Sequence, residues 1–303
     1  MSTTTLDRKP VFVFSHPRTA SNLFMKIFKS HPDVVQSEYP FLKIFFFGST
    51  ESQYDRKGPK MDEARAEFQE TSLPKSYHES FNKLEEDIRS AVIDSNLKTP
   101  RPPRLVPQLQ PKDAEVRIST NPTLLPDDLM LSVSPVFLIR HPALVFPSWY
   151  KLSRAAFDAD VDDSDFPVEA SFKWSRILYD WYLKIWSESS SDPPGTQHRK
   201  PAVIDADDTM SDRAALERLC HQLLLDPQHL SFEWQVATTG LLPWLSTIQK
   251  STGVDMSKLS KGIDTQQEFV KWEREFGSHA AQKLLYFVEL AIPDYEYLLA
   301  QRG

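Results

Sequence analysis

Two short apolar segments, far apart in the chain, each end abruptly at a basic residue with a proline nearby. Residues 11–14 are followed closely by Arg18, and residues 136–139 are followed directly by Arg140. Both segments are rich in β-branched and aromatic residues, which favour strands, and both pass into a stretch with helical periodicity. In an open parallel sheet, anions bind at such strand-to-helix turns, because helix N-termini and loop N–H groups attract negative charge. Two basic turns therefore predict a ligand that carries two anionic groups.

The overall charge restricts where such a ligand can bind. The 303-residue chain has a formal net charge of −7, which argues against a broad surface for nucleic acid or anionic membrane and favours a local basic pocket. Cys220 is the only cysteine, so an intramolecular disulfide is impossible and a reducing compartment is expected. The first ten residues lack the apolar core of a signal peptide, and no apolar run reaches about eighteen residues. We therefore expect a soluble, cytoplasmic protein.

Predicted strands alternate with predicted helices along the chain. This order is typical of an α/β fold with a central parallel sheet. We expect one domain over residues 1–303, with a flexible N-terminus at 1–10 and loops at 49–60, 158–166 and 187–200. The acidic run within the second of these loops lacks the glycine turn of a calcium site and is interpreted as a solvated loop. The predicted strands are 11–14, 115–119, 134–139 and 202–204. The main predicted helices are 20–30, 61–71, 77–94, 147–157, 172–186 and 212–225, and the tail at about 266–302 is predicted to be mostly helical.

The two basic turns resemble the nucleotide-binding motifs of sulfotransferases that use 3′-phosphoadenosine 5′-phosphosulfate. In that family a first strand leads into a loop of the type Pro-Lys/Arg-Ser-Gly-Thr-Thr, which matches residues 17–22 here. A later strand ends in an Arg-Asp-Pro-like turn with a serine eight residues after the arginine, which matches Arg140 and Ser148. Three further stretches resemble the same family, namely residues 171–182, Lys271-Trp272 and residues 293–298.

The resemblance implies a fold, a reaction and a set of binding residues. The fold would be a three-layer α/β/α arrangement around a parallel sheet, similar to that of P-loop nucleoside triphosphate hydrolases. The chain would be a divergent sulfotransferase that uses this co-substrate and needs no metal. Arg140 and Ser148 would hold the 3′-phosphate. The loop would hold the 5′-phosphosulfate through Arg18, Thr19, Ala20, Ser21 and Asn22.

Arg18 also suits the chemistry of the transfer. A sulfuryl group in transfer concentrates negative charge on its oxygens, and a fixed cation stabilises that transition state more than the ground state. The planar guanidinium fork fits an oxyanion well. A Walker loop, Gly-x-x-x-x-Gly-Lys-Ser/Thr, is absent from the sequence, so a kinase or ATPase lacks its main support.

Three positions depart from the family pattern. Ala20 stands where the family has a glycine, and glycine lets a phosphate approach the backbone closely, so we expect a narrower pocket. Asn22 replaces a hydroxyl residue, although its amide can still donate a hydrogen bond. His141 replaces the usual acid after Arg140, and we interpret it as a packing residue of the turn.

The sequence leaves two candidates for the catalytic base. Many family members use a histidine in a Lys-Thr-His-Leu-Pro stretch, but the equivalent residues 117–126 contain none. Glu38 lies about twenty residues after the loop, where other branches of the family have a glutamate, and a carboxylate in an aromatic pocket can act as base. An ordinary glutamate on an exposed turn fits Glu38 equally well. His78 is the second candidate. Two further candidates for a ligand contact are His16, which adjoins the loop, and Lys261-Gly262, which faintly resembles the family's late Lys-Gly nucleotide contact.

The expected partner is a small-molecule acceptor with a hydroxyl or phenol group. Aromatic residues in regions that line acceptor pockets in the family suit an apolar molecule, although most aromatics are core residues in any fold. The eight histidines lack metal-ligand spacing, so no metal site is predicted. The oligomeric state, a homodimer included, stays open. The aromatic residues concerned are Phe41, Phe45, Phe46, Phe47 and Tyr77.

Two other functions stay open at this point. The glycine-free loop and the missing histidine favour a lyase, dehydratase or cyclase that has reused the fold for an aromatic metabolite without a sulfuryl donor. Arg140 and Ser148 oppose that alternative, because such chemistry has no evident need for the pair. A nucleotide-binding protein without turnover is the second alternative.

Overall fold

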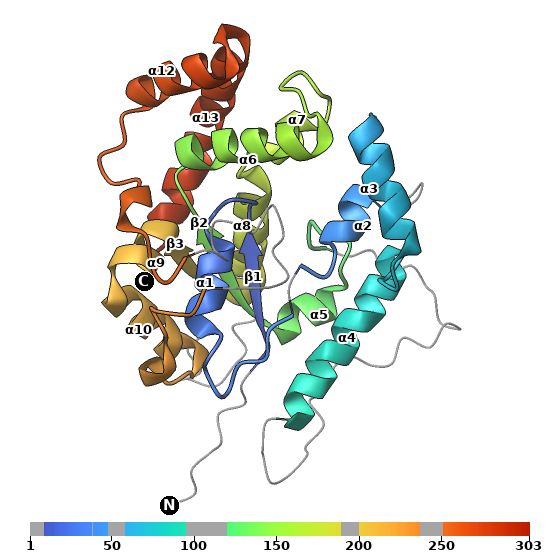
Figure 1. Ribbon diagram of the computed structural model, residues 1–303. Coiled ribbons are helices and arrows are strands. Elements are labelled where there is room, and N and C mark those ends of the chain that lie inside the picture. The colour runs from blue at the N-terminus through green and yellow to red at the C-terminus, as the bar shows by residue number, and fades with distance from the viewer. Residues whose placement is uncertain (1–8, 38, 48–57, 95–119, 189–199, 237–250) are drawn as a thin grey trace, which may run out of the picture.

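The computed structural model has a central sheet with helices packed on both faces (Figure 1). It describes residues 9–37, 39–47, 58–94, 120–188, 200–236 and 251–303. The elements are β1 (Val11–Ser15), α1 (Ser21–Phe28), α2 (Leu42–Phe47), α3 (Pro59–Glu70), α4 (Tyr77–Asp94), α5 (Asp127–Ser132), β2 (Ser134–Ile139), α6 (Pro142–Phe157), α7 (Phe166–Glu169), α8 (Lys173–Glu188), β3 (Ala202–Asp205), α9 (Ala206–Ser211), α10 (Arg213–Leu223), η1 (Pro227–His229), η3 (Met256–Lys258), α12 (Thr265–Phe276) and α13 (Ser278–Leu299).

The described strands form one parallel sheet in the order β1-β2-β3. Val13 of β1 pairs with Val136 of β2, and Ile139 of β2 pairs with Asp205 of β3. Parallel strands need a crossover connection, and here helices cover the sheet between successive strands. The central strand β2 is covered on both sides, which explains why its sequence is continuously apolar. The prediction of an α/β fold with a parallel sheet is confirmed.

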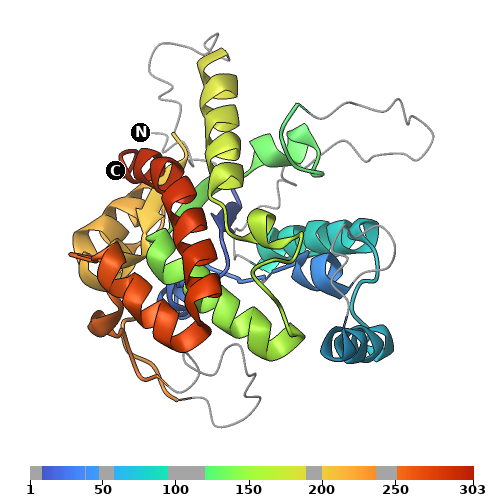
Figure 2. The same ribbon diagram turned by 90° about the horizontal axis from the view of Figure 1, so that it is seen from above.

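The pleat of β2 sends alternate side chains into two separate cores. Phe137 and Ile139 pack with the aromatic residues of α6 and α8 and with α13. Val136 and Leu138 pack on the opposite face with α1 and α10. This alternation follows from the two-residue period of a strand. Figure 2 shows that α13 lies alongside α6 and α12. The two C-terminal helices therefore complete the core that contains Phe137 and Ile139.

Most elements lie where the sequence predicts them, but α6 begins earlier than expected. The helix predicted to follow Pro147 starts at Pro142, so Pro147 lies inside it. Proline lacks the N–H that would bond four residues back, which usually ends a helix. The helix continues here because Phe146 and Trp149, on either side of Pro147, are buried in the cores. Tertiary packing has therefore outweighed a local breaker.

The acidic segment after α6 is a loop, as predicted. Lys60 Nζ lies 2.8 Å from Asp158 Oδ1, and Asp162 contacts both His279 and Lys283. Among the described residues, no group of three or more His, Cys, Asp or Glu side chains is arranged to hold a metal ion. Two of the loop's carboxylates, those of Asp158 and Asp162, thus pair with basic side chains of α3 and α13.

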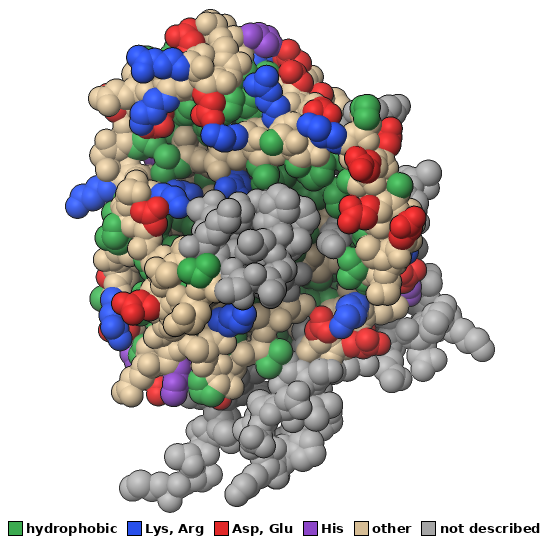
Figure 3. Space-filling model, in the orientation of Figure 1, with side chains coloured by type: hydrophobic (Ala, Val, Ile, Leu, Met, Phe, Trp, Pro, Cys, Tyr) green, Lys and Arg blue, Asp and Glu red, His purple; other side chains and the backbone are tan. Residues whose placement is uncertain are grey.

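Several expected features fall largely outside the described residues. These are the N-terminus at 1–10, the loops at 49–60 and 187–200, and the strand at 115–119. No helix in the described part of the chain is both long and apolar enough to span a membrane. On the face seen in Figure 3, basic side chains are interspersed with acidic ones over the surface. This face therefore agrees with the expectation that binding of an anion depends on a local pocket.

Candidate active site

The carboxyl ends of the three parallel strands bring the two basic turns together. β1 leads into the loop that carries Arg18, β2 ends one residue before Arg140, and β3 ends at Asp205 (Figure 1). Ligands of open α/β sheets bind at this edge, because the loops and helix N-termini converge there. The register of the sheet thus makes one site from segments more than a hundred residues apart.

The loop between β1 and α1 has a strained backbone. Arg18 has φ 73° and Ala20 has φ 62°, both in the left-handed region that favours glycine. Ala20 is the N-cap of α1 and offers no side-chain acceptor to the first-turn N–H groups. Thr19 is fully buried, and its hydroxyl donates to the His16 carbonyl oxygen at 2.8 Å. The buried Thr19 side chain therefore stabilises the loop from its core side. The backbone N–H groups in the first turn of α1 have no side-chain cap.

Hydrogen bonds join the loop to both later motif residues. Arg18 Nε donates to Ser148 Oγ at 2.9 Å. Arg140 donates through Nη1 to the Arg18 carbonyl oxygen at 3.3 Å and through Nη2 to the Lys258 carbonyl oxygen at 2.8 Å. The structure therefore gathers Arg18, Arg140 and Ser148 in one cluster, to which the segment around Lys258 also belongs.

The two guanidinium groups lie in a site that holds little compensating negative charge. Burial lowers the pKa of Arg18 and of Arg140, and the charge of Arg18 lowers the pKa of Arg140 further. Asp207 and Asp205 oppose this effect on Arg140 from a distance. Within the described residues neither guanidinium forms an ion pair with a carboxylate, and Arg140 Nε is buried without a hydrogen-bond partner. Partly buried cations without counter-ions are costly, so the site is suited to receive an anion.

Ser21 and Asn22, at the start of α1, share one partner that the sequence did not indicate. Tyr39 Oη lies 2.8 Å from Ser21 Oγ and donates to Asn22 Oδ1 at 3.0 Å. Burial lowers the pKa of Arg18, and the nearby Tyr39 partly offsets this effect. Its φ of 50° makes it, with Arg18 and Ala20, one of five non-glycine residues in the left-handed region among those described. Three such residues around one loop agree with the tendency of strain to gather at functional sites.

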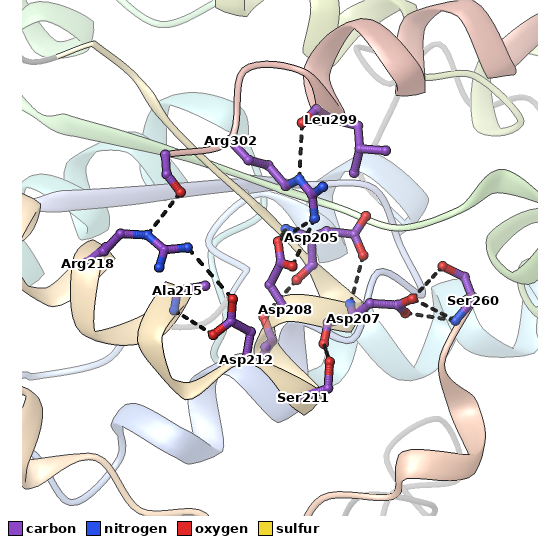
Figure 4. Close-up of polar contacts among 12 residues, drawn as sticks. Asp205, Asp207, Asp208, Ser211, Asp212, Ala215, Arg218, Ser260, Leu299 and Arg302 are labelled. Atoms are coloured by element: carbon purple, nitrogen blue, oxygen red, sulfur yellow. Dashed lines mark hydrogen bonds and ion pairs between the residues drawn. The ribbon is translucent and has the colours of Figure 1, made fainter. Parts of the chain in front are cut away.

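A carboxylate at the start of α9 anchors the segment that faces Arg140. Asp207 accepts hydrogen bonds from the Ser260 backbone N–H, at 2.8 and 2.9 Å, and from the Ser260 hydroxyl at 2.7 Å. Figure 4 shows the two side chains pointing toward one another. Lys261 and Gly262 follow directly, and Gly262 has φ 76° in a turn. The weakly matched Lys-Gly pair thus lies on a segment that contacts Arg140, although no hydrogen bond links the pair itself to the loop among the described residues.

Asp205 is a buried carboxylate beside this anchor. It accepts hydrogen bonds from the Asp207 N–H at 2.7 Å and from Tyr295 Oη at 3.0 Å. Burial raises the pKa of Asp205 to about 6, because the charged form loses its solvation. Asp208, in the first turn of α9, accepts from the Asp205 N–H at 3.3 Å and binds Arg302 at 2.9 and 3.0 Å (Figure 4). The C-terminal segment is therefore tied to the strand end that borders the site.

The two histidines next to the motifs have structural contacts. His141 is the N-cap of α6, and its Nδ1 accepts from the Ala143 N–H at 3.2 Å while its ring packs on Tyr295. An aspartate at this position would cap the helix in the same way, so the replacement keeps that role. His16 is buried, with Nδ1 2.6 Å from the Pro17 carbonyl oxygen and Nε2 against the Glu169 carbonyl oxygen. These contacts turn His16 toward the core and away from a role as a sulfate ligand.

The two candidate bases have different standing in the structure. Glu38 lies outside the described residues, so its assignment stays a prediction. His78 is exposed in the first turn of α4 and forms no hydrogen bond, ion pair or ring contact with another described residue.

The aromatic residues expected near the acceptor divide into two groups. Phe46 is buried against Trp149 in a local core, and Phe45 and Phe47 pack against that core. The rings of Phe41 and Tyr77 are partly exposed and stack with their centroids 6.3 Å apart.

Comparison with known proteins gives two curated relatives, both named sulfotransferase ppzF. The protein from Metarhizium majus is 38% identical over 192 residues, which are 60% of this chain and 56% of the relative. The protein from Metarhizium rileyi is 37% identical over 193 residues, with the same shares of 60% and 56%. The chain thus spans little more than half the length of the curated relatives it matches. No protein-family model matches the chain, and no solved structure does. The resemblance to sulfotransferases predicted from the motifs is confirmed by the two relatives.

Proposed function

We propose that this chain, a divergent relative of the sulfotransferases, transfers a sulfuryl group from 3′-phosphoadenosine 5′-phosphosulfate to a hydroxyl or phenol of a small molecule. One observation carries the proposal. Arg18 and Arg140 lie partly buried at the carboxyl edge of a parallel sheet, and within the described residues neither forms an ion pair with a carboxylate. Arg140 donates to the Arg18 carbonyl oxygen, and Arg18 donates to Ser148. A ligand with two anionic groups would compensate both cations at once.

The residues divide the ligand between them in this proposal. The uncapped N–H groups at the start of α1, with the side-chain amide of Asn22, would bind the 5′-phosphate. Arg140 and Ser148 would bind the 3′-phosphate, and Lys261 lies on the neighbouring segment. The proposed fold is the larger P-loop-like sulfotransferase architecture, of which the described three-stranded sheet and its two helical layers would be the centre.

The chemistry asked of the protein is charge stabilisation and removal of one proton. When bound, the donor supplies a sulfuryl group whose bond to the 5′-phosphate oxygen breaks as a bond to the acceptor oxygen forms. Arg18 would stabilise the negative charge that gathers on the transferred and leaving oxygens. Glu38 would accept the proton of the acceptor hydroxyl, and a carboxylate next to aromatic side chains is suited to that role. The half-exposed ring pair of Phe41 and Tyr77 lies on the elements that follow this segment and would suit an apolar acceptor.

Binding of adenosine 3′,5′-bisphosphate tests the proposal before an acceptor is known. We expect calorimetric titration to show binding that needs the 3′-phosphate, with adenosine 5′-monophosphate as the comparison ligand. Arg140→Ala should weaken bisphosphate binding by about ten- to a hundredfold, because a charged hydrogen bond contributes roughly 1.5–3 kcal/mol. The same change should leave binding of the monophosphate nearly unaltered. Arg154→Ala, an exposed arginine in the last turn of α6, is the matched control.

The result also separates the alternatives. Binding that follows this pattern would justify a screen of phenols and alcohols as acceptors, with release of the bisphosphate as the readout. A folded protein that binds neither nucleotide would contradict the proposal and favour a donor-independent lyase, dehydratase or cyclase. Binding without transfer to any acceptor would favour the nucleotide-binding protein.

A further inference from the structure

Tyr39 contacts the loop, although no sequence motif indicated it. Its phenol oxygen lies between the side chains of Ser21 and Asn22, both of which the sequence places near the 5′-phosphate. The distances are 2.8 Å to Ser21 Oγ and 3.0 Å to Asn22 Oδ1, both within normal hydrogen-bond range. Ser21 and Asn22 are consecutive residues of α1. One phenol oxygen therefore fixes two neighbouring side chains at the helix start.

The number of protons available decides the direction of these two bonds. A phenol has one O–H, and the Tyr39 O–H donates to Asn22 Oδ1, which can only accept. The bond between Tyr39 Oη and Ser21 Oγ must then use the serine proton, with the phenol oxygen as acceptor. The chain of donors thus runs from Ser21 through Tyr39 to Asn22.

This direction has a consequence for the amide of Asn22. An asparagine side chain can present either its oxygen or its NH₂ group to a ligand, and only the NH₂ group attracts an anion. The Tyr39 O–H engages the oxygen, so the two N–H donors are left for other acceptors. Within the described residues these N–H groups have no protein acceptor. Tyr39 therefore selects the side-chain orientation in which Asn22 attracts an anion.

The backbone holds Tyr39 firmly in this position. Its φ of 50° is unfavourable for a residue with a side chain, so surrounding contacts must maintain it. The Tyr39 carbonyl oxygen accepts from the Leu42 N–H at 3.1 Å, at the start of α2. Ile44 and Phe46 of α2 are buried, at 3% and 6% exposure, and Phe46 packs on Trp149, the neighbour of Ser148. The segment is thus anchored to the same helix that carries the Arg18 contact.

We propose that Tyr39 is a positioning residue for the 5′-phosphate, which acts by turning the amide donors of Asn22 toward the ligand. This inference rests on the proposed function, because it requires that the loop bind the 5′-phosphate of the donor. Asn22 stands where the family has a hydroxyl residue, which can rotate its own proton toward a phosphate. An amide cannot adapt in that way, and the phenol supplies the missing orientation.

The test compares ligands with and without the 5′-phosphate. Tyr39→Phe keeps the ring and removes only the O–H, so we expect binding of adenosine 3′,5′-bisphosphate to weaken by about three- to tenfold. Adenosine 3′-monophosphate, measured by its competition with adenosine 3′,5′-bisphosphate, should bind equally well to the wild type and to Tyr39→Phe. In the Asn22→Ala background the same change should have no further effect, because the group that it orients is gone. Asn22→Asp, which replaces the amide donors by a carboxylate, should weaken bisphosphate binding more than Tyr39→Phe does.

The control is Tyr286→Phe, a tyrosine that is 55% exposed on α13, and thermal unfolding verifies that each variant folds. Unchanged bisphosphate binding in Tyr39→Phe would overturn the inference. So would equal weakening of both nucleotides, or an effect of the same size in the Asn22→Ala background, since either result indicates a general structural role. Failure of the proposed function has a different signature, because the wild-type protein would then bind neither nucleotide.

Discussion

Replacing Ala20 by glycine should stabilise this protein, although glycine usually destabilises. Ala20 has φ 62° and ψ 25°, a left-handed conformation that costs a residue with a Cβ roughly 1–2 kcal/mol. Glycine removes this cost but gains freedom in the unfolded chain, which subtracts about 0.4–1 kcal/mol. The net expectation for Ala20→Gly is a rise of about 0.5–1 kcal/mol in the free energy of unfolding.

Urea titration of the wild type and the variant, followed by circular dichroism, measures this change. The matched control is Ala66→Gly, at an exposed position inside α3, where the same substitution should lower the free energy of unfolding by about 1 kcal/mol. The two substitutions are chemically identical and should differ in sign. A loss of stability in Ala20→Gly as large as that in Ala66→Gly would refute the reasoning, because it would mean that the loop backbone at Ala20 is not left-handed.

The same comparison has a functional side. Loss of the Cβ at the N-cap of α1 opens the approach to the first-turn N–H groups. We therefore expect Ala20→Gly to bind adenosine 3′,5′-bisphosphate at least as tightly as the wild type. A stabilised variant that binds the bisphosphate more weakly would show that the Ala20 methyl group contributes to the site.

Three further predictions concern two carboxylates near the site and the candidate bases Glu38 and His78. The pKa of Asp205 is raised from 3.8 to about 6, so the stability contributed by its neutral form is complete below about pH 4 and is lost as the pH rises through 6. At 1.36 kcal/mol per pKa unit, this loss is about 3 kcal/mol. We therefore expect the difference in the free energy of unfolding between Asp205→Asn and the wild type to shift in favour of the variant by that amount between pH 4 and pH 7. A difference that stays constant with pH would contradict the assignment. Asp207→Asn offers one acceptor oxygen where Ser260 uses two, so urea titration should show a loss of about 1–3 kcal/mol, larger than the loss in Ser260→Ala. Once an acceptor is found, Glu38→Gln should lower kcat by about a hundredfold or more. His78→Ala should keep a kcat near that of the wild type, since His78 is exposed. Unchanged rates in both variants would remove Glu38 and His78 as candidates for the base.

The departures from the family pattern take on a physical meaning in the structure. His141 keeps the helix-capping role of the acid that it replaces, because its Nδ1 accepts the Ala143 N–H. Ala20 has the left-handed conformation that a glycine would adopt without strain. Asn22 keeps a donor, and its orientation depends on Tyr39. Each substituted residue thus has a local structural role in the loop or helix start, which a comparison of residue types alone does not show.

The sequence by itself determined the elements and the order of the motifs. Periodicity and composition are local properties, and they predicted the strands at 11–14, 134–139 and 202–204 and most helices within a few residues. The position of Arg18 and Arg140 directly after strands also follows from the sequence. Pro147 is the exception, because burial of its neighbours in α6 outweighed the breaker, and burial is not a local property.

Only the tertiary structure decided which side chains meet. The contact between Arg18 and Ser148 spans 130 residues, and that between Arg140 and the Lys258 carbonyl oxygen spans 118. Such contacts depend on the strand order and register of the sheet and on how the helices pack on it, which no local pattern in a single chain encodes. Tyr39 is only 17 residues from Asn22, yet its role arises from a left-handed backbone and the anchoring of α2 in the core. Sequence separation sets which contacts local forces can specify, and the rest are fixed by the packing of the whole fold.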